Sequence, residues 1–397
     1  MQNSGALEGV RVLDLTRVLA GPFATMMLAD MGAEVIKIEV PKTGDDSRQF
    51  GPFLNGESSY YMNLNRNKKG ITLNLKGRGR EIFLEMVKKA DIVVENYRPG
   101  TMEKLGLGYE DLKKINPRIV YGAVSGFGHY GPYKDRAGYD IIGQAMSGLM
   151  STTGWPGGEP TRTGTAMSDV LAGLSVTIGI LAALRHRDIS GIGQKVDVAL
   201  VDSTVASMEI INQIYLVDKR LPERIGNRYE SVYPYDSFKA KDGSMVIGAG
   251  NDKLWRKLCI VMNQPELGGK PEFESNWKRV KDHAAVKAVV EAWTITKSVK
   301  EIVDTLLEAG VPAAPINNIE QVINDPHIAG AREMFVEVDH PIAGKMKITG
   351  SHIKLSETKP CIKTPAPLLG QHNKEVYTEL LGLSIDEIAA MKAEGLI

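Results

Sequence analysis

The stretch TGTAMSDVLAG, residues 163–173, places one carboxylate, Asp169, between small residues and the start of a long apolar run. A Ser-Asp pair before such a run is typical of a helix N-terminus, where the side chain of Ser168 or Asp169 accepts hydrogen bonds from unpaired backbone N–H groups. The positive end of the helix dipole would keep this carboxylate ionised, and an ionised carboxylate can attack an acyl group. Local sequence therefore leaves two roles open for Asp169, helix cap and nucleophile.

A second chemically suggestive stretch is VIGAGN, residues 246–251. Its G-x-G follows an expected strand, but Lys253 stands where a dinucleotide fingerprint has its third glycine, which disfavours a nicotinamide site. No Walker phosphate loop and no HExxH metal motif occurs in the sequence. The backbone N–H groups near Gly248 and Gly250 could donate to a developing oxyanion, and the alternative is a simple glycine turn between strand and helix.

Composition excludes several classes of function. Among 397 residues, Lys plus Arg and Asp plus Glu each total 48, so no net charge favours nucleic acid or an anionic membrane surface. Cys259 and Cys361 form no CxxC spacing, which suits structural thiols in a reducing compartment. The N-terminus lacks a secretory signal, and the apolar tract 170–184 is shorter than the roughly 20 residues of a membrane span. We therefore expect a cytoplasmic protein in which this tract is a buried helix.

The elements that position these residues alternate between strand-like and helix-like segments, as in a parallel sheet covered by helices. The expected strands cover residues 10–16, 34–39, 71–75, 91–97, 118–126 and 194–200, with helices between them, one starting near Asp169 and another over 202–217. This pattern predicts an α/β fold with a Rossmann-like open parallel sheet, in which ligands lie at the carboxyl ends of the strands.

The chain is expected to form two domains. Residues 1–217 make the first part of the large domain, and 218–235, charged and rich in turn residues, form a linker. Residues 236–330 make a smaller α+β domain that starts with a hairpin around the KDG turn at 241–243. Residues 331–397 are expected to return and complete the large domain.

Four segments carry a family likeness: LEGVRVLDLTRVLAGPFATMMLADMGAEVIKIE (7–39), DIVVENYRPGTMEKLGLGYEDL (91–112), AVSGFGHYGPYKDRAGYD (123–140) and TGTAMSDVLAGL (163–174). Together they resemble the class III coenzyme A-transferase (CaiB/BaiF) family, which includes formyl-CoA transferase and carnitine CoA-transferase. The likeness runs over essentially the whole chain with the family's spacing. It implies an acyl-CoA:carboxylate CoA-transferase that uses acyl-CoA and a carboxylic acid as substrates, holds no tightly bound cofactor or metal, and forms an interlaced homodimer.

The resemblance also implies roles for individual residues. Asp169 matches the family's nucleophile, which forms an acyl anhydride and then an aspartyl-CoA thioester. Gly248 and Gly250 match a glycine-rich loop that shields these species, and Tyr60 and Tyr139 match substrate-side tyrosines. The positions that match coenzyme A contacts are Ala20, Thr72, Leu73, Asn74, Leu75, Asn96, Tyr97, Arg98, Lys104, Tyr139 and Asp140. Leu19 and Val40 replace polar residues of formyl-CoA transferase, which disfavours formate or oxalate as the acid.

Two other functions stay open. Related racemases carry AGHD where this chain has AGYD, and Tyr139 is a poor base at neutral pH because phenols have a pKa near 10. His129 is nearby in sequence but out of register, and we expect it on the surface. A non-catalytic acyl-CoA-binding protein is the other alternative. The sequence does not identify the acid substrate, although Arg48, Arg136 or Arg162 could hold a second carboxylate of a dicarboxylic acid.

Overall fold

The computed structural model describes residues 5–397 and divides the chain into two compact units. The larger unit contains residues 5–149, 162–218 and 326–397, and the smaller contains 150–161 and 219–325. The stretch 150–161, which the sequence analysis placed in the large domain, thus belongs with the smaller unit. The cause is local pairing, because the Gly226 N–H donates to the Gly154 carbonyl and the Arg224 guanidinium to the Ser151 carbonyl.

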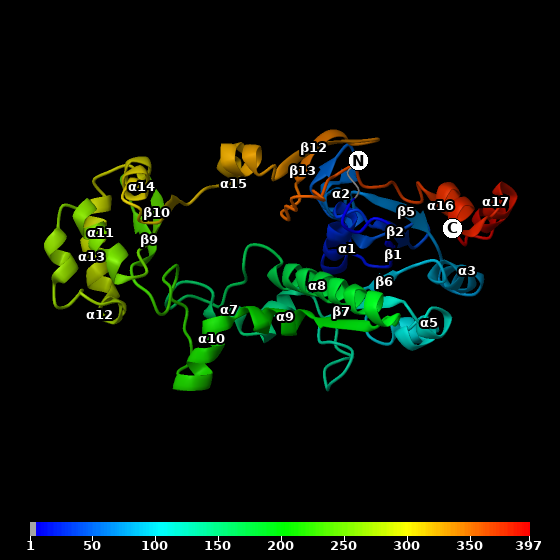
Figure 1. Ribbon diagram of the computed structural model, residues 1–397, viewed down its shortest axis with the longest axis horizontal. Coiled ribbons are helices and arrows are strands. Elements are labelled where there is room, and N and C mark those ends of the chain that lie inside the picture. Colours follow the sequence, from blue (N-terminus) through cyan, green and yellow to red (C-terminus); the bar gives the residue numbers. More distant parts are fainter. Residues whose placement is uncertain (1–4) are drawn as a thin grey trace. The chain divides into compact units, whose positions relative to one another are not determined.

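The larger unit is built on a six-stranded, wholly parallel sheet in the order β5-β2-β1-β6-β7-β8 (Figure 1). Its strands are β1 (Arg11–Asp14), β2 (Glu34–Glu39), β5 (Lys68–Thr72), β6 (Ile92–Glu95), β7 (Val120–Ser125) and β8 (Lys195–Ala199). Counted along the chain, this order is 3-2-1-4-5-6, the order of the Rossmann fold. The α/β prediction is confirmed, although the third strand begins and ends a few residues earlier than 71–75.

Alternate strand residues supply two apolar clusters, one on each face of the sheet. Leu13, Ile36 and Val93 pack on one face with helices α3 (Arg78–Val87), α5 (Tyr109–Ile115), α16 (Asn373–Leu381) and α17 (Ile385–Ala393). Val12 and Val35 pack on the other face with α1 (Ala20–Asp30) and α8 (Met167–Ser190). Burial on both faces explains why the strands are almost continuously apolar.

Helix α8 is longer than its apolar tract suggested. By length and composition alone this helix of 24 residues could cross a membrane, since an 18-residue window within it has a mean hydropathy of 1.8. Its inner side is buried against the sheet and α1, and a Cβ on Gly173 would lie 2.8 Å from the Ala20 carbonyl oxygen. The helix ends at Gly191, which takes the left-handed conformation with φ +76° that glycine favours. This packing is that of a core helix.

The remaining elements of the larger unit connect or extend this framework. The helix expected over 202–217 is divided into α9 (Leu200–Ser207), α10 (Glu209–Gln213) and a π-helical turn (Ile214–Asp218). Strands β12 (Phe335–His340) and β13 (Gly344–Thr349) form a hairpin before the C-terminal helices. Short helices α2 (Ser59–Leu64), α4 (Thr101–Lys104) and α6 (Asp140–Met146) lie beyond the ends of the strands.

The smaller unit is α+β. A three-stranded sheet, β9 (Tyr235–Lys239), β10 (Ser244–Gly248) and β11 (Ala313–Pro315), packs with α11 (Asp252–Val261), α13 (His283–Thr294) and α14 (Val299–Glu308). The expected hairpin is present as the antiparallel pair β9–β10. Cys259 is buried in this unit, whereas Cys361 in the larger unit is exposed, so only Cys259 has the environment of a structural thiol.

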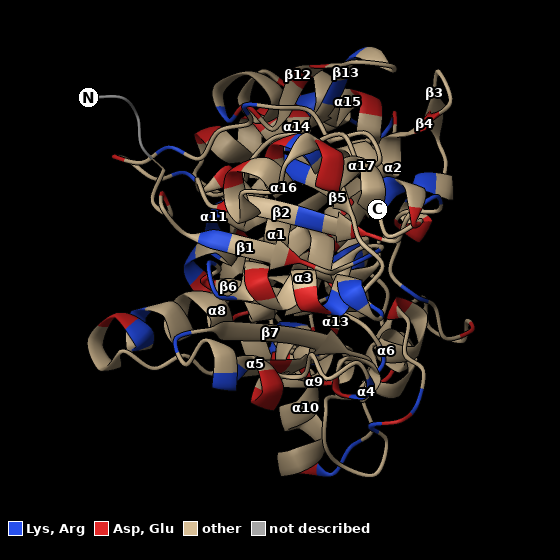
Figure 2. Cartoon of the chain, turned by 90° about the vertical axis from the view of Figure 1, so that its right-hand side faces the viewer, with Lys and Arg blue, Asp and Glu red and all other residues tan. Residues whose placement is uncertain are grey.

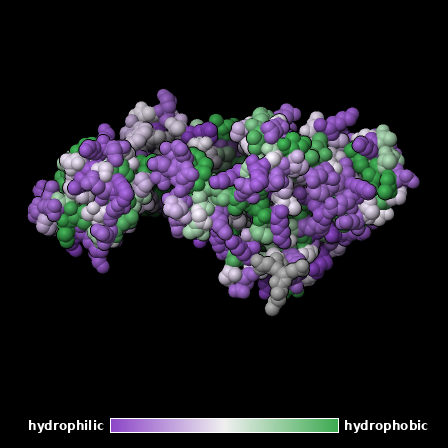
Figure 3. All heavy atoms as spheres, turned by 90° about the horizontal axis from the view of Figure 1, so that it is seen from above, coloured by the Kyte–Doolittle hydropathy of each residue, from purple (hydrophilic) through white to green (hydrophobic). Residues whose placement is uncertain are grey.

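Charged side chains of both signs are interspersed through the chain (Figure 2), and the face in Figure 3 mixes hydrophilic with hydrophobic residues. No group of three or more His, Cys, Asp or Glu in residues 5–397 is arranged to hold a metal ion. The candidate site in the described residues is a pocket of the larger unit rather than a metal centre.

Candidate active site

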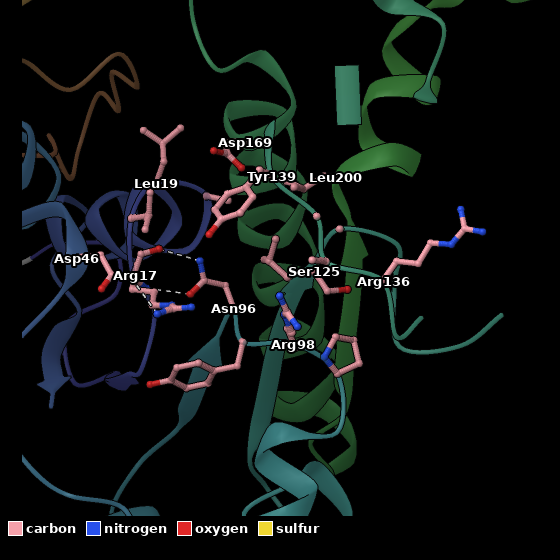
Figure 4. A pocket seen from close by; sticks show the side chains of 18 residues that line it. Arg17, Leu19, Asp46, Asn96, Arg98, Ser125, Arg136, Tyr139, Asp169 and Leu200 are labelled. Atoms are coloured by element: carbon pink, nitrogen blue, oxygen red, sulfur yellow. Dashed lines mark hydrogen bonds and ion pairs between the residues drawn. The ribbon is translucent and has the colours of Figure 1, made fainter. Parts of the chain in front are cut away.

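A pocket of about 140 Å³ opens at the carboxyl ends of β1, β6 and β7 (Figure 4). Its walls come from the segments 17–20 after β1, 96–99 after β6 and 124–126 at the end of β7, together with 136–139, Asp169 and Leu200. Strands β1 and β6 are neighbours from which the chain runs in opposite directions across the sheet. This is the topological switch point, where open α/β sheets bind ligands.

Asp169 lies in the first turn of α8 and faces this pocket. Burial and then the negative charge of Asp140 raise the pKa of Asp169 from 3.8 to about 7. The sequence-based expectation that the helix dipole keeps this carboxylate fully ionised is therefore wrong at neutral pH. Desolvation and a second carboxylate outweigh the dipole at this position.

The N-terminus of α8 is capped by the side chain of a residue that is distant in sequence. The Ser168 N–H donates to Asp140 Oδ1 at 2.8 Å, and Asp140 Oδ2 accepts from Gln144 Nε2 at 2.8 Å. The Ser168 hydroxyl is buried and accepts from Thr204 Oγ1 at 2.8 Å. Neither Ser168 nor Asp169 caps the helix through its own side chain, contrary to the local prediction. The Asp169 carboxylate is consequently not occupied in capping.

Asn96 joins two walls of the pocket. Its side-chain oxygen accepts from the Arg17 N–H at 2.8 Å and its amide donates to the Arg17 carbonyl at 2.8 Å, as the dashed lines in Figure 4 show. Arg98 and Ala20 also line the pocket. Tyr97 contributes to the lining while its ring packs against the sheet's apolar cluster. The structure thus brings five of the predicted coenzyme A residues, these four and Tyr139, together with Asp169.

Two tyrosines lie near Asp169. Tyr139 lines the pocket, and 69% of its surface is exposed. The labels of Asp169 and Tyr139 are close together in the upper middle of Figure 4. Burial, followed by the charges of Asp169, Asp45 and Asp140, raises the pKa of Tyr60 to about 12. Tyr60 therefore stays protonated at neutral pH and can donate a hydrogen bond to a carboxylate or an oxyanion.

Other predicted residues lie elsewhere. Lys104 is exposed at the end of α4 and does not line the pocket. Asp140 does not line it either, and its carboxylate instead caps α8 by accepting from the Ser168 N–H. In segment 72–75, the N–H groups of Thr72, Leu73 and Asn74 already donate to Asn373 Oδ1, the Glu39 carbonyl and the Leu396 carbonyl. Leu73 is buried and Leu75 partly buried in the apolar cluster, so the C-terminal segment covers much of this main chain.

The glycine loop belongs to the smaller unit. The Gly248 N–H donates to the Pro312 carbonyl and the Ala249 N–H to the Pro234 carbonyl, while Asn251 caps α11. These two N–H groups are engaged inside their own unit, which corrects the expectation that they are available to an oxyanion. The geometry here is that of a turn from strand β10 into helix α11, and shielding by Gly250 stays a prediction.

The structure also changes the expectations for His129 and Arg48. The side chain of His129 is only 8% exposed rather than on the surface, because its Nδ1 lies 2.9 Å from Lys195 Nζ and its Nε2 lies 3.6 Å from Glu95 Oε1. Arg48 is held by both carboxylate oxygens of Glu39, at 2.8 and 2.7 Å, and so has a structural role.

Two further arginines line the pocket, Arg17, which the sequence analysis did not single out, and Arg136, which it named as a possible partner of a second carboxylate. Arg17 directly follows the first strand and pairs with Asp46 at 2.9 Å, a position at which the strand-end rule could have flagged it. Arg136 lines the pocket and stacks on Tyr133, with 3.6 Å from its guanidinium carbon to the ring centroid. Arg162 is exposed and does not line the pocket.

Comparison with known proteins agrees with this geometry. The model of "CoA-transferase family III" matches residues 7–373. The mouse succinyl-CoA:glutarate CoA-transferase is 41% identical over 98% of this chain and 90% of its own length. The Acetobacter aceti acetyl-CoA:oxalate CoA-transferase is 43% identical over 89% of this chain and 90% of its own length. A crystal structure of a CaiB/BaiF family protein from Brucella suis superposes with a TM-score of 0.83 at 36% identity, covering 95% of this chain and all of that one. The chain belongs to the class III CoA-transferase family and is a CoA-transferase that uses CoA thioesters and carboxylates.

Proposed function

We propose that this enzyme transfers coenzyme A from an acyl-CoA to a dicarboxylic acid, with Asp169 as the covalent nucleophile. The observation that carries the mechanism is the place of Asp169: an uncommitted carboxylate in the pocket at the strand switch point. Its pKa of about 7 leaves a substantial ionised fraction at neutral pH and a carboxylate that is more basic than usual.

The reaction proceeds through two anhydrides. A carboxylate oxygen of Asp169 attacks the thioester carbonyl carbon, the C–S bond breaks, and coenzyme A leaves as a thiolate. The thiolate attacks the aspartyl carbonyl of the anhydride, which releases the donor acid and leaves an aspartyl-CoA thioester. The acceptor carboxylate attacks that thioester to form the second anhydride and free the thiolate again. Attack of the thiolate on the acceptor's acyl carbon yields the new acyl-CoA and restores the Asp169 carboxylate.

The residues around Asp169 support these steps. Tyr60, protonated because its pKa is about 12, is suited to donate to the carbonyl oxygen as it gains negative charge. Arg98 and Arg136 supply cationic groups to the same pocket, where phosphate or carboxylate oxygens would be favourable partners. Every covalent intermediate is an aspartyl anhydride or an aspartyl-CoA thioester, so the free energy of the donor thioester is conserved instead of being lost to hydrolysis.

A dicarboxylic acceptor is supported by the named relatives, which act on glutarate with succinyl-CoA and on oxalate with acetyl-CoA. The prediction from Leu19 and Val40 against oxalate stays a prediction, and the experiment below includes that acid. A racemase is disfavoured because Tyr139 occupies the position of the base and His129 does not line the pocket.

The test is incubation of the purified enzyme with succinyl-CoA or acetyl-CoA and each of oxalate, succinate, glutarate and mesaconate, followed by mass spectrometry of the CoA esters. A new acyl-CoA is expected with at least one diacid, and none with Asp169→Ala. Peptide mapping after hydroxylamine quenching should place a hydroxamate on Asp169. Absence of any new ester, with α-deuterium exchange into a 2-methylacyl-CoA, would contradict the transferase assignment.

We also propose that the enzyme is a cytoplasmic homodimer of interlaced chains, as its family resemblance implies. Light scattering after size-exclusion chromatography should give about twice the 43.3 kDa chain mass, and cell fractionation should recover the protein with the soluble fraction. A monomer at micromolar concentration would contradict the interlaced assembly.

A further inference from the structure

The loop between β1 and α1 carries backbone strain at the pocket. Val18, which lines the pocket, has φ +66°, in the left-handed region that a β-branched side chain rarely adopts. Such a conformation persists only where the surrounding structure over-determines it, and it tends to occur at functional sites. The loop is therefore held in place by other residues.

Three consecutive loop residues are each fixed by a side chain from elsewhere in the fold. The Thr16 carbonyl accepts from Lys37 Nζ at 2.5 Å, the Arg17 N–H donates to Asn96, and the Val18 N–H donates to Asp45 Oδ1 at 3.0 Å. Asn96 is itself a pocket residue, but Asp45 and Lys37 do not line this pocket. Their hydrogen bonds to Thr16 and Val18 connect them to the loop that forms its wall.

Asp45 and Lys37 form one buried unit. Asp45 Oδ2 accepts from Lys37 Nζ at 2.7 Å, and the side chains are 1% and 0% exposed. Asp45 Oδ1 also accepts from the N–H and hydroxyl of Ser47, at 2.9 and 2.8 Å, so the carboxylate is fixed on both sides. Although burial opposes ionisation, the Lys37 charge holds the pKa of Asp45 well below its usual range. Asp45 is thus a fixed anion at every pH at which the enzyme would work.

Stability alone does not account for this pair. The free-energy cost of desolvating two charges offsets much of the gain from their attraction. Proteins in which apolar residues replace a buried ion pair are often as stable as the original. The structural consequence of the pair for the pocket lies in two other hydrogen bonds, which orient Thr16 and Val18. Lys37 lies on β2, which pairs with β1, the strand before this loop.

We propose that Asp45, with Lys37, is a positioning residue for the coenzyme A site that holds the Arg17–Ala20 loop in its strained conformation beside Asp169. This inference rests on the proposed function in one respect, namely that this pocket binds coenzyme A. Loss of the Val18 hydrogen bond lets the loop relax toward negative φ and displaces the wall formed by Val18, Leu19 and Ala20.

The test measures binding of coenzyme A itself by calorimetry, which needs no turnover. Asp45→Ala is expected to raise the Kd by about tenfold or more, since a misplacement of about 1 Å can cost up to a hundredfold. Asp45→Asn keeps an oxygen acceptor for the Val18 N–H and should fall between Asp45→Ala and the unmodified enzyme. Adding Val18→Gly to Asp45→Ala should recover most of the affinity, because glycine adopts φ +66° without strain.

The matched control is Asp30→Ala. Asp30 forms an equally buried pair with Arg66, at 2.7 Å and with side chains 2% and 1% exposed, but neither residue lines this pocket. It should lower the melting temperature while leaving the Kd for coenzyme A within about twofold. If Asp45→Ala does not fold, the double variant Lys37→Met/Asp45→Leu removes both charges at similar volume and is expected to fold but bind weakly.

Three results would overturn the positioning role: an unchanged Kd in the folded Asp45 variants, an equal rise in Asp30→Ala, or no recovery with Val18→Gly. Each is distinct from failure of the proposed function. An unmodified enzyme that binds no coenzyme A contradicts the assignment of the pocket, whereas one that binds it and transfers it to no acid contradicts only the reaction.

Discussion

Replacing Asp169 with asparagine should stabilise the folded enzyme, and the stabilisation should grow with pH. Asp169 titrates at about 7 in the fold, against 3.8 for an ordinary aspartate, because burial and Asp140 disfavour its charged form. The folded state therefore binds this proton more tightly than the unfolded chain does. The stability that Asp169 contributes is complete below pH 4 and is lost as the pH rises through 7.

The size of the effect follows from the shift. A change from 3.8 to about 7 corresponds to roughly 4 kcal/mol at about 1.4 kcal/mol per pKa unit, an order-of-magnitude value. Roughly 3 kcal/mol of this is expected to develop between pH 5 and pH 8. Asparagine has nearly the same shape and no charge to desolvate. The Asp169→Asn variant should thus gain on the unmodified enzyme over that interval and level off above it.

The measurement is the urea midpoint and the melting temperature of both proteins at pH 5, 6, 7 and 8. Asp188→Asn is the matched control, because Asp188 lies on the same helix with 59% of its side chain exposed. The control should show little change with pH. A constant difference between Asp169→Asn and the unmodified enzyme across the series, or a gain that shrinks as pH rises, would refute the reasoning.

Three further changes test neighbouring parts of the site. Asp140→Asn keeps an acceptor for the Ser168 N–H but removes the charge that raises the pKa of Asp169, so the acid limb of the kcat–pH profile should move to lower pH; an unmoved limb contradicts this. Gly173→Ala places a Cβ 2.8 Å from the Ala20 carbonyl oxygen and should cost about 1–3 kcal/mol in urea unfolding. Burial raises the pKa of Glu95 from 4.5 to about 8, so Glu95→Gln should gain stability relative to the unmodified enzyme as the pH rises between these values and level off above 8; parallel urea-midpoint curves against pH would count against it.

The sheet could be predicted because its signals are local. Each strand is a short, nearly continuous apolar run bounded by turn residues, which is the pattern of a strand buried on both faces. The family resemblance singled out Asn96, Arg98 and Ala20, which lie at or just after the ends of expected strands, and the structure has the pocket at that edge of the sheet. Arg17 also directly follows an expected strand but was not singled out, since a single surface arginine carries no pattern.

What could not be predicted depends on contacts between residues far apart in the chain. A Ser-Asp pair at a helix start predicts a local cap, and nothing in the stretch 163–173 indicates that Asp140 reaches Ser168 from another helix. That single contact has two consequences for the chemistry. It frees the Asp169 carboxylate from capping, and it places a second negative charge close enough to raise the pKa of Asp169. The residue that satisfies the backbone of α8 thus also makes the neighbouring carboxylate a stronger base, so capping the helix and presenting a basic carboxylate to the pocket are divided between two aspartates.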